Sequence, residues 1–316
     1  MKFSKDFKEI KGDASFRKFY RNTKKNSIIV FANKEKTKNL LIYDSINKIL
    51  IKNNIIAPQL LSQNYKKNYI EIHDLGKKTI YQIFSNYKKK QYPIFKKAIN
   101  VLNKIQLVKD KKIKNFKNEF YLIKDYKNKI LLDEANLFSH WYVPKKLDKK
   151  KINIFKTKFN REIKLLLSKL HFKNDTFVHR DFHVSNLIVN SKNQIGLIDN
   201  QDALIGNKAY DLASLIDDVR YKTSNSLKEK VYNYYLMTNK KINADKFKND
   251  YDILSVLRNL KIIGIFMRLA ERDKKRKYLK LIPYAWKMID NRIGKNKDLV
   301  NLKLLLETNF PKFITK

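Results

Sequence analysis

Three polar side chains near the middle of the chain have the types and the spacing that phosphoryl transfer requires. Asp181 lies within the segment 179–186, which Asn186 ends, and Asp199 follows Asp181 by eighteen residues. Phosphoryl transfer needs a carboxylate beside the attacking hydroxyl and oxygen ligands that fix Mg²⁺ on the nucleotide phosphates. We therefore predict that Asp181 accepts the hydroxyl proton, and that Asn186 and Asp199 are the neutral and charged Mg²⁺ ligands.

The residues between Asn186 and Asp199 predict the element that positions them. Apolar residues at 187–189 and 195–198 flank turn-prone residues at 190–193, which is the pattern of a β-hairpin. A hairpin would return Asp199 to the edge at which Asn186 lies. Each residue alone could simply cap a turn, but the complete set in this order favours phosphoryl transfer.

Four neighbouring residues are expected to support this site rather than to react. His179 and His183 could ligate a metal, but two loop histidines without a third ligand more often pack and hydrogen-bond. Asp211 begins a predicted helix, where it could cap the helix or accept backbone N–H groups of the catalytic loop. Asp202, just after the second strand, is expected to support the loop as well.

Hydrophobic patterning predicts an α+β chain with two lobes. Short β-rich runs at 27–31 and 69–72 enclose one helical segment, whereas the pattern from Lys77 onward is mainly helical. We predict a nucleotide-binding lobe at 1–74 and a catalytic and acceptor-binding lobe at 75–316.

The net charge is extreme, because 70 Lys and Arg face 30 Asp and Glu, which gives +40. Such an excess would ordinarily suggest nucleic acid or an anionic membrane. However, amino acids encoded by A/T-rich codons crowd the sequence, while there are only 6 Gly and 5 Pro. The excess of Lys is therefore interpreted as composition bias spread over the surface, in preference to a nucleic-acid site.

The composition also limits the class of protein. Apolar residues make up 43% of the 316 positions, which is enough for a folded core. The absence of Cys excludes disulfides and thiolate metal sites. No leader-like apolar region and no apolar stretch of ~18 residues is found, so we expect a cytoplasmic protein without a membrane partner.

The same residues carry a resemblance to a known family. The segments 179–186 and 199–202 resemble the catalytic block of the aminoglycoside-phosphotransferase-like kinases. Flanking segments are similar to those of the anomeric kinases for N-acetylmuramate and N-acetylglucosamine within that group. These segments are 12–17, 73–76, 131–142, 210–215 and 258–279, so the resemblance covers nearly the whole chain.

This resemblance implies a bilobal protein-kinase-like fold with a small β-rich N-lobe and a larger, mainly helical C-lobe. It also implies an enzyme that uses ATP and Mg²⁺ to phosphorylate the anomeric hydroxyl of an amino sugar during cell-wall sugar recycling. Its expected partners are a nucleotide and a small sugar, and a monomer is favoured.

The resemblance also implies which residues bind the nucleotide. They are Gly12, Ser15, Arg17, Lys34, His73 and Asp74. The kinase pattern expects a lysine inside the strand at 27–31, which has none, so Arg17 or Lys34 would supply the missing charge. A second departure is Asn200, which stands where the family usually has an aromatic or apolar residue.

Four residues are implied on the acceptor side. Glu134 would accept sugar hydroxyls and Trp141 would offer a plane for the ring. Arg268 and Arg272 are one helical turn apart and could bind the lactyl carboxylate of N-acetylmuramate. The alternatives are that Trp141 is ordinary core and that both arginines line a solvated helix face.

Other functions stay open at this point. The chain could phosphorylate another alcohol, of the aminoglycoside, choline or homoserine type, although a cationic drug calls for an acidic pocket and carboxylates are few. It could also be a basic nucleic-acid-binding module or an inactive pseudokinase. The intact catalytic set argues against inactivity, whereas the missing strand lysine argues for it.

Overall fold

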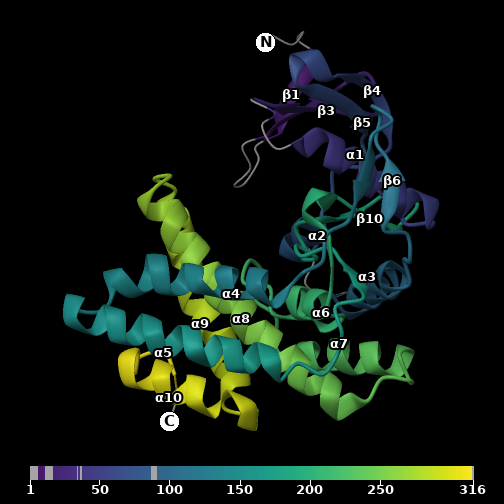
Figure 1. Ribbon diagram of the computed structural model, residues 1–316. Coiled ribbons are helices and arrows are strands. Elements are labelled where there is room, and N and C mark those ends of the chain that lie inside the picture. The colour runs from purple at the N-terminus through teal and green to yellow at the C-terminus, as the bar shows by residue number, and fades with distance from the viewer. Residues whose placement is uncertain (1–5, 11–16, 34, 36–37, 87–90, 315–316) are drawn as a thin grey trace. The chain divides into compact units, whose positions relative to one another are not determined.

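The computed structural model describes residues 6–10, 17–33, 35, 38–86 and 91–314. The chain forms two compact units (Figure 1). The first comprises Met1–Lys124 and Val184–Leu204, and the second comprises Asp125–His183 and Ile205–Lys316. These units are groups of residues that contact one another, and their bounds say nothing of ligands. The assignment of nucleotide binding to residues 1–74 and of catalysis and acceptor binding to 75–316 stays a prediction.

An antiparallel sheet with the strand order β1-β2-β3-β5-β4 forms the base of the first unit. Its strands are β1 (Phe7–Ile10), β2 (Arg17–Asn22), β3 (Ser27–Ala32), β4 (Leu60–Asn64) and β5 (Tyr69–His73). Helix α1 (Asn39–Lys52) packs on the sheet, where its Leu40 and Tyr43 share a core with Val30 and Ile70. The two strands and the helix expected here from the sequence are confirmed.

The predicted hairpin is also confirmed and belongs to the first unit. Its strands β9 (Leu187–Val189) and β10 (Ile195–Leu197) pair antiparallel, with Leu187 opposite Leu197. The backbone of Leu197 donates to the Ile56 carbonyl at 2.8 Å, which ties the hairpin to the chain before β4. The remaining elements of this unit are α2 (Ile80–Asn86), α3 (Gln91–Gln106), β6 (Lys112–Lys114) and β7 (Phe120–Leu122).

Helices dominate the second unit, as expected. They are α4 (Asn128–Leu137), α5 (Lys149–Ser168), α6 (Ala209–Ile216), α7 (Asn225–Thr238), α8 (Ala244–Glu271), α9 (Ile282–Ile293) and α10 (Val300–Asn309). Two short strands, β8 (Thr176–Val178) and β11 (Leu204–Gly206), pair with each other. None of the helices in the described part of the chain is both long and apolar enough to span a bilayer.

Helix α8 is the centre of the second unit, and its close contact with the end of α4 depends on Gly264. A Cβ atom at this position would lie 2.3 Å from the carbonyl carbon of Leu137, so any other side chain would force the two backbones apart. Around this crossing, Phe138, Trp286 and Phe310 pack edge to face or tilted, with ring centroids 5.5 to 5.6 Å apart. Most residues of the segment 262–269 of α8 are buried here.

A buried carboxylate connects four helices of this unit. Asp217 follows α6 and is 1% exposed. It accepts hydrogen bonds from Lys228 of α7 at 2.9 Å and from Arg292 of α9 at 3.0 Å. The Ser255 hydroxyl of α8 donates to it at 2.6 Å. The buried Lys228 and the partly buried Arg292 thus share one buried anion.

Replacing Asp217 with Ala is expected to lower the free energy of unfolding by about 3 to 5 kcal/mol, because the change leaves buried cations without a partner. Burial would raise the pKa of Asp217, but Lys228 and Arg292 outweigh it and lower the pKa well below its usual range. A depressed carboxyl pKa stabilises the fold above the ordinary value of 3.8 and loses that effect as the pH falls below it. Urea unfolding at pH 7 and at pH 3 measures both effects, and the difference from wild type should shrink at pH 3.

Asp133→Ala is the control. Asp133 is exposed and lies 3.7 Å from Lys129, an exposed pair that contributes about 1 kcal/mol or less. Equal destabilisation by the two substitutions at pH 7 would contradict the importance of the buried cluster.

Candidate active site

Asp181 lies in the loop that follows β8 in the second unit, and Asp211 fixes the backbone of this loop. The Asp211 carboxylate, on the first turn of α6, accepts the backbone N–H of His179 at 2.7 Å and that of Arg180 at 3.0 Å. Arg180 has a positive φ of 72°, a sparsely populated conformation that needs such support. Of the two roles considered for Asp211, these hydrogen bonds correspond to the second.

The two histidines of the loop are buried beside Asp181. The Asp181 N–H donates to Nδ1 of His179 at 3.3 Å, and the His179 ring packs edge-on against Phe182. The His183 N–H donates to the Asp181 carbonyl at 3.0 Å. Burial, followed by the nearby charge of Arg220, lowers the pKa of His183 to about 3, so its imidazole is neutral at pH 7.

The Asp181 carboxylate is partly exposed and ionised at neutral pH. Burial would raise the pKa of Asp181, but the surrounding positive charge outweighs it and lowers the pKa well below its usual range. The groups responsible are His183, which is charged only in acid, followed by Lys261, Arg258 and Arg220. Such a carboxylate can accept a hydrogen bond from a hydroxyl throughout the physiological pH range.

Glu134 has a different environment from the one expected of a sugar ligand. Its largely buried carboxylate, on α4, accepts hydrogen bonds from Arg180 and from the Tyr126 hydroxyl. Lys261 of α8 lies 3.0 Å from the same carboxylate. Glu134 thus holds the side chain that precedes Asp181, and sugar binding by Glu134 stays a prediction.

Asn186 and Asp199 lie together in the first unit, at the open end of the hairpin. The Ile198 N–H donates to the Asn186 carbonyl at 3.1 Å, immediately beyond the paired residues Leu187 and Leu197. Asp199 has a positive φ of 65°. The two predicted metal ligands are therefore neighbours, whereas Asp181 belongs to the second unit, and convergence of the three on one phosphoryl group is part of the proposal below.

The donor set at this end of the hairpin fits Mg²⁺. No group of three or more His, Cys, Asp or Glu suited to a metal ion occurs among the described residues. Mg²⁺ needs fewer, because it typically binds one or two protein oxygens and completes its shell with phosphate oxygens and water. The Asp199 carboxylate, 38% exposed, and the Asn186 amide supply hard oxygen donors of this kind.

A buried arginine lies beside Asp199. Arg17, the first residue of β2, donates to the Asp199 carboxylate and to Oε1 of Gln201 at 2.7 Å. Its guanidinium lies over the rings of Phe19 and Tyr43, at 5.5 and 5.7 Å from their centroids. Arg17 thus places a positive charge beside Asp199 from β2, the strand that pairs with β3, where the kinase pattern expects the lysine. Gly12, Ser15 and Lys34 lie outside the described residues.

The departure at Asn200 has a structural explanation. Asn200 is fully buried, and its Nδ2 donates to Oδ1 of Asn47 on α1 at 2.7 Å and to the Leu197 carbonyl at 3.2 Å. A polar link therefore connects α1 to the loop that carries Asp199. Asp202 is exposed and accepts a hydrogen bond from Gln201 at 2.6 Å.

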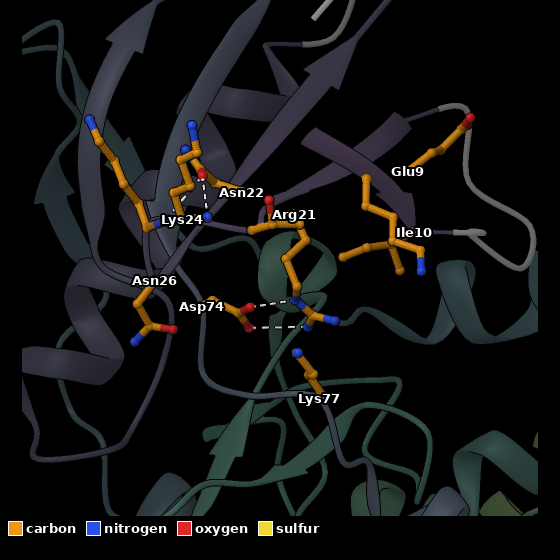
Figure 2. Close-up of a pocket in the computed structure, with 11 residues that line it drawn as sticks. Glu9, Ile10, Arg21, Asn22, Lys24, Asn26, Asp74 and Lys77 are labelled. Atoms are coloured by element: carbon orange, nitrogen blue, oxygen red, sulfur yellow. Dashed lines mark hydrogen bonds and ion pairs between the residues drawn. The ribbon is translucent and has the colours of Figure 1, made fainter. Parts of the chain in front are cut away.

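Asp74, which the resemblance implies as a nucleotide-binding residue, lines a pocket of the first unit with a volume of about 590 Å³ (Figure 2). Arg21 of β2 donates to Asp74 through Nε at 2.5 Å and to the Gly76 carbonyl at 3.0 Å. Gly76, with φ of 126°, donates its N–H to Asp74 at 2.9 Å. His73 lies 2.9 Å from the Asn26 amide.

Arg21 was not identified from the sequence. The alternation of a strand puts it on the same face of β2 as Arg17 and Phe19, which is the signal that could have indicated it. Figure 2 shows its guanidinium beside Asp74, with Lys77 close by.

The predicted acceptor-side arginines lie at the end of α8, with Arg268 in its last turn and Arg272 immediately after it. Arg272 is exposed and forms a two-point ion pair with Asp273, at 2.7 and 3.0 Å. Arg268 is half-buried, and its pKa is lowered by burial and by Arg272. Trp141 is partly exposed, whereas the buried tryptophan of this unit is Trp286.

Comparisons with known proteins agree with this geometry. The sequence matches the phosphotransferase enzyme family over residues 6–244. It is 26% identical to an N-acetylmuramate/N-acetylglucosamine kinase of Pseudomonas putida, over 93% of this chain and 85% of that protein. It is 27% identical to a protein of the same name from Neisseria meningitidis, over 86% of this chain and 80% of that protein.

Solved structures show the same fold. A choline/ethanolamine kinase family protein from Mesorhizobium loti superposes with a TM-score of 0.63 at 11% identity, over 96% of this chain and 93% of that one. The ADP-bound aminoglycoside phosphotransferase APH(2'')-Ib gives a TM-score of 0.57 at 14% identity, over 90% and 94% of the two chains. The bilobal kinase-like fold expected from the sequence is confirmed.

A double-mutant cycle tests the link between α1 and the Asp199 loop. Because the amides of Asn47 and Asn200 hydrogen-bond directly in a buried position, Asn47→Ala and Asn200→Ala should be coupled by about 1 kcal/mol. Urea unfolding of both single variants and the double variant measures this coupling. The exposed pair Asn190 and Gln194, whose amides lie 3.4 Å apart, is the control and should show little coupling. Strictly additive effects of Asn47→Ala and Asn200→Ala would contradict the link.

Proposed function

The chain belongs to the phosphotransferase enzyme family, and on that premise we propose that it is an ATP- and Mg²⁺-dependent sugar kinase. The acceptor is the anomeric hydroxyl of N-acetylmuramate or N-acetylglucosamine, the role is cell-wall sugar recycling, and the enzyme acts in the cytoplasm as a monomer. The observation that carries the proposal is the ionised Asp181 in a loop fixed by Asp211. The names of relatives that match most of the chain support the choice of acceptor.

Asp181 acts as the proton acceptor in this proposal. An anomeric hydroxyl is more acidic than an ordinary alcohol because of the ring oxygen, so a weakly basic carboxylate suffices. Asp181 orients the hydroxyl and receives its proton as the sugar oxygen attacks the γ-phosphorus in line with the departing ADP. His183 is neutral at pH 7, so it does not form an ion pair with the Asp181 carboxylate, which stays available to the hydroxyl.

Asn186 and Asp199 hold Mg²⁺ in this proposal. When bound, the ion neutralises charge on the nucleotide phosphates. Arg17 lies beside Asp199 and takes the role of the missing strand lysine toward the phosphates, while the segment of His73 and Asp74 contacts the base. A guanidinium suits this role because it is charged at every physiological pH and lies beside the carboxylate proposed to bind Mg²⁺.

The positive charge around Asp181 disfavours cationic acceptors. Arg220, Arg258 and Lys261 act on the Asp181 carboxylate from the same unit. A polycationic aminoglycoside or the quaternary ammonium of choline would be repelled there, whereas a neutral or acidic sugar would not.

An acceptor panel tests the function. ADP release should depend on N-acetylmuramate or N-acetylglucosamine and not on kanamycin, choline or homoserine. Replacing Asp181 with Asn should lower kcat by about 10³-fold, because the proton acceptor is lost. The affinity for ATP, measured by calorimetry, should stay nearly unchanged.

Asp133→Asn, an exposed change on α4, is the control for the loss of one carboxylate. Failure of both sugars to stimulate ADP release would eliminate the sugar-kinase proposal. Undiminished turnover by Asp181→Asn would mean that another residue accepts the proton.

Arg17 provides a separate prediction for the nucleotide site. Arg17→Met should raise the KM for ATP by about 10-fold or more, because it removes a charge-assisted contact to phosphate. Arg17→Lys should recover part of this loss. The neighbouring exposed Lys18→Met is a matched control on the opposite face of β2. An unchanged KM for ATP in Arg17→Met would show that another group replaces the strand lysine.

A further inference from the structure

One face of helix α8 lies between two parts of the second unit. Ser255 donates to Asp217, which precedes Asp218 and Arg220, while Lys261 contacts Glu134, the partner of Arg180. Arg258 is three residues from each of them, so it shares their face of the helix. Arg258 therefore lies on α8 between the residue that contacts the segment 217–220 and the residue that contacts the partner of Arg180, next to Asp181.

Arg258 is a buried cation that forms no ion pair with a carboxylate in the described part of the chain. It is 3% exposed, and its Nη1 has no hydrogen-bond partner among the described residues. The other two strongly buried cations in the described part of the chain behave differently, because Arg17 pairs with Asp199 and Lys228 with Asp217. Burying a guanidinium without an anion is costly, so an anion that binds from solution would offset that cost.

Arg220 adds a second guanidinium on the same side. Its side chain is 26% exposed, and its ion-pair partner Asp218 lies 3.6 Å from its Nη1, beyond hydrogen-bond distance. This Nη1 also has no hydrogen-bond partner in the part of the chain that the structure describes. Helix α8 contacts Asp217 through Ser255 and, through Lys261, the Glu134 carboxylate that holds Arg180, so Arg258 between them lies on the side of the Asp181 loop. The charges of Arg258 and Arg220 both lower the pKa of Asp181. An anion between them would therefore lie beside the reacting hydroxyl.

We propose that Arg258 and Arg220 form an anion subsite next to Asp181 that binds the carboxylate of an acidic acceptor sugar. The inference rests on the proposed function and makes it more specific, because it selects N-acetylmuramate, with its lactyl carboxylate, over the neutral N-acetylglucosamine. It moves the carboxylate contact away from Arg268 and Arg272, of which Arg272 is already paired with Asp273. The phosphoryl group in transit is the other anion that could reach this position.

The test compares the two sugars in wild type, Arg258→Gln and Arg220→Gln. The quantity measured is kcat/KM for N-acetylmuramate divided by kcat/KM for N-acetylglucosamine. We expect this ratio to fall by about 30-fold in Arg258→Gln and by about 10-fold in Arg220→Gln, the size expected for a lost charge-assisted hydrogen bond. Arg161→Gln, which removes an exposed charge on α5, should leave the ratio within about twofold.

A second measurement uses the unmodified enzyme. N-acetylmuramate whose lactyl carboxylate has been converted to the amide should lose about 30-fold in kcat/KM relative to the acid. If Arg258→Gln does not fold, Arg220→Gln and the amide decide the question.

The outcomes separate the inference from the function. If wild type phosphorylates neither sugar, the proposed function fails. If it phosphorylates both and the ratio is unchanged in Arg258→Gln and Arg220→Gln, only the anion subsite is overturned. Equal losses of kcat/KM on both sugars in Arg258→Gln and Arg220→Gln would mean that these arginines contact the phosphoryl group instead. A fall of the ratio in Arg268→Gln alone would mean that the carboxylate binds at Arg268 and Arg272, the arginines predicted from the sequence. Both results would overturn the subsite.

Discussion

A charged side chain is stable inside a protein only when an opposite charge or several hydrogen bonds accompany it, and this constraint organises both units. Asp217 lies where four helices meet and holds Lys228 and Arg292. Glu134 holds Lys261 and Arg180 in the same way, next to the loop of Asp181. Ion pairs thus stabilise both the meeting point of four helices and the loop that carries Asp181, the proposed proton acceptor.

The same constraint gives meaning to the arginines near the candidate site. Arg17 is buried in the first unit with Asp199 as its partner, which places a positive charge beside a predicted Mg²⁺ ligand. Arg258 is equally buried but has no carboxylate partner among the described residues. The charge of Arg17 is balanced by Asp199 before any phosphate binds, whereas a ligand would have to supply the anion that balances Arg258. The net charge of +40 does not indicate which arginines bind a ligand. The burial and the partners of each arginine do.

Patterns of neighbouring residues predicted the strands, the helix and the hairpin. The side-chain pairs between residues far apart in the chain could not be predicted. The strand at β3, helix α1 and the hairpin around residues 190–193 follow from apolar periodicity and turn chemistry, and the block from His179 to Asp202 follows from spacing. The partners of Arg21, Glu134 and Asp217 lie 53, 46 and 75 residues away in the chain, at Asp74, Arg180 and Arg292. No single-sequence signal specifies such pairs. The buried Asn200 departed from the family pattern, and only its contact with Asn47 explained why.

The central claim is that Asp181 directs an anomeric hydroxyl of an amino sugar onto the γ-phosphoryl group. Phosphorus NMR of the product made from ATP and N-acetylmuramate or N-acetylglucosamine tests this claim most directly. We predict a phosphate signal coupled to the anomeric proton of the sugar. A phosphate coupled to the protons of any other carbon of the sugar would contradict it.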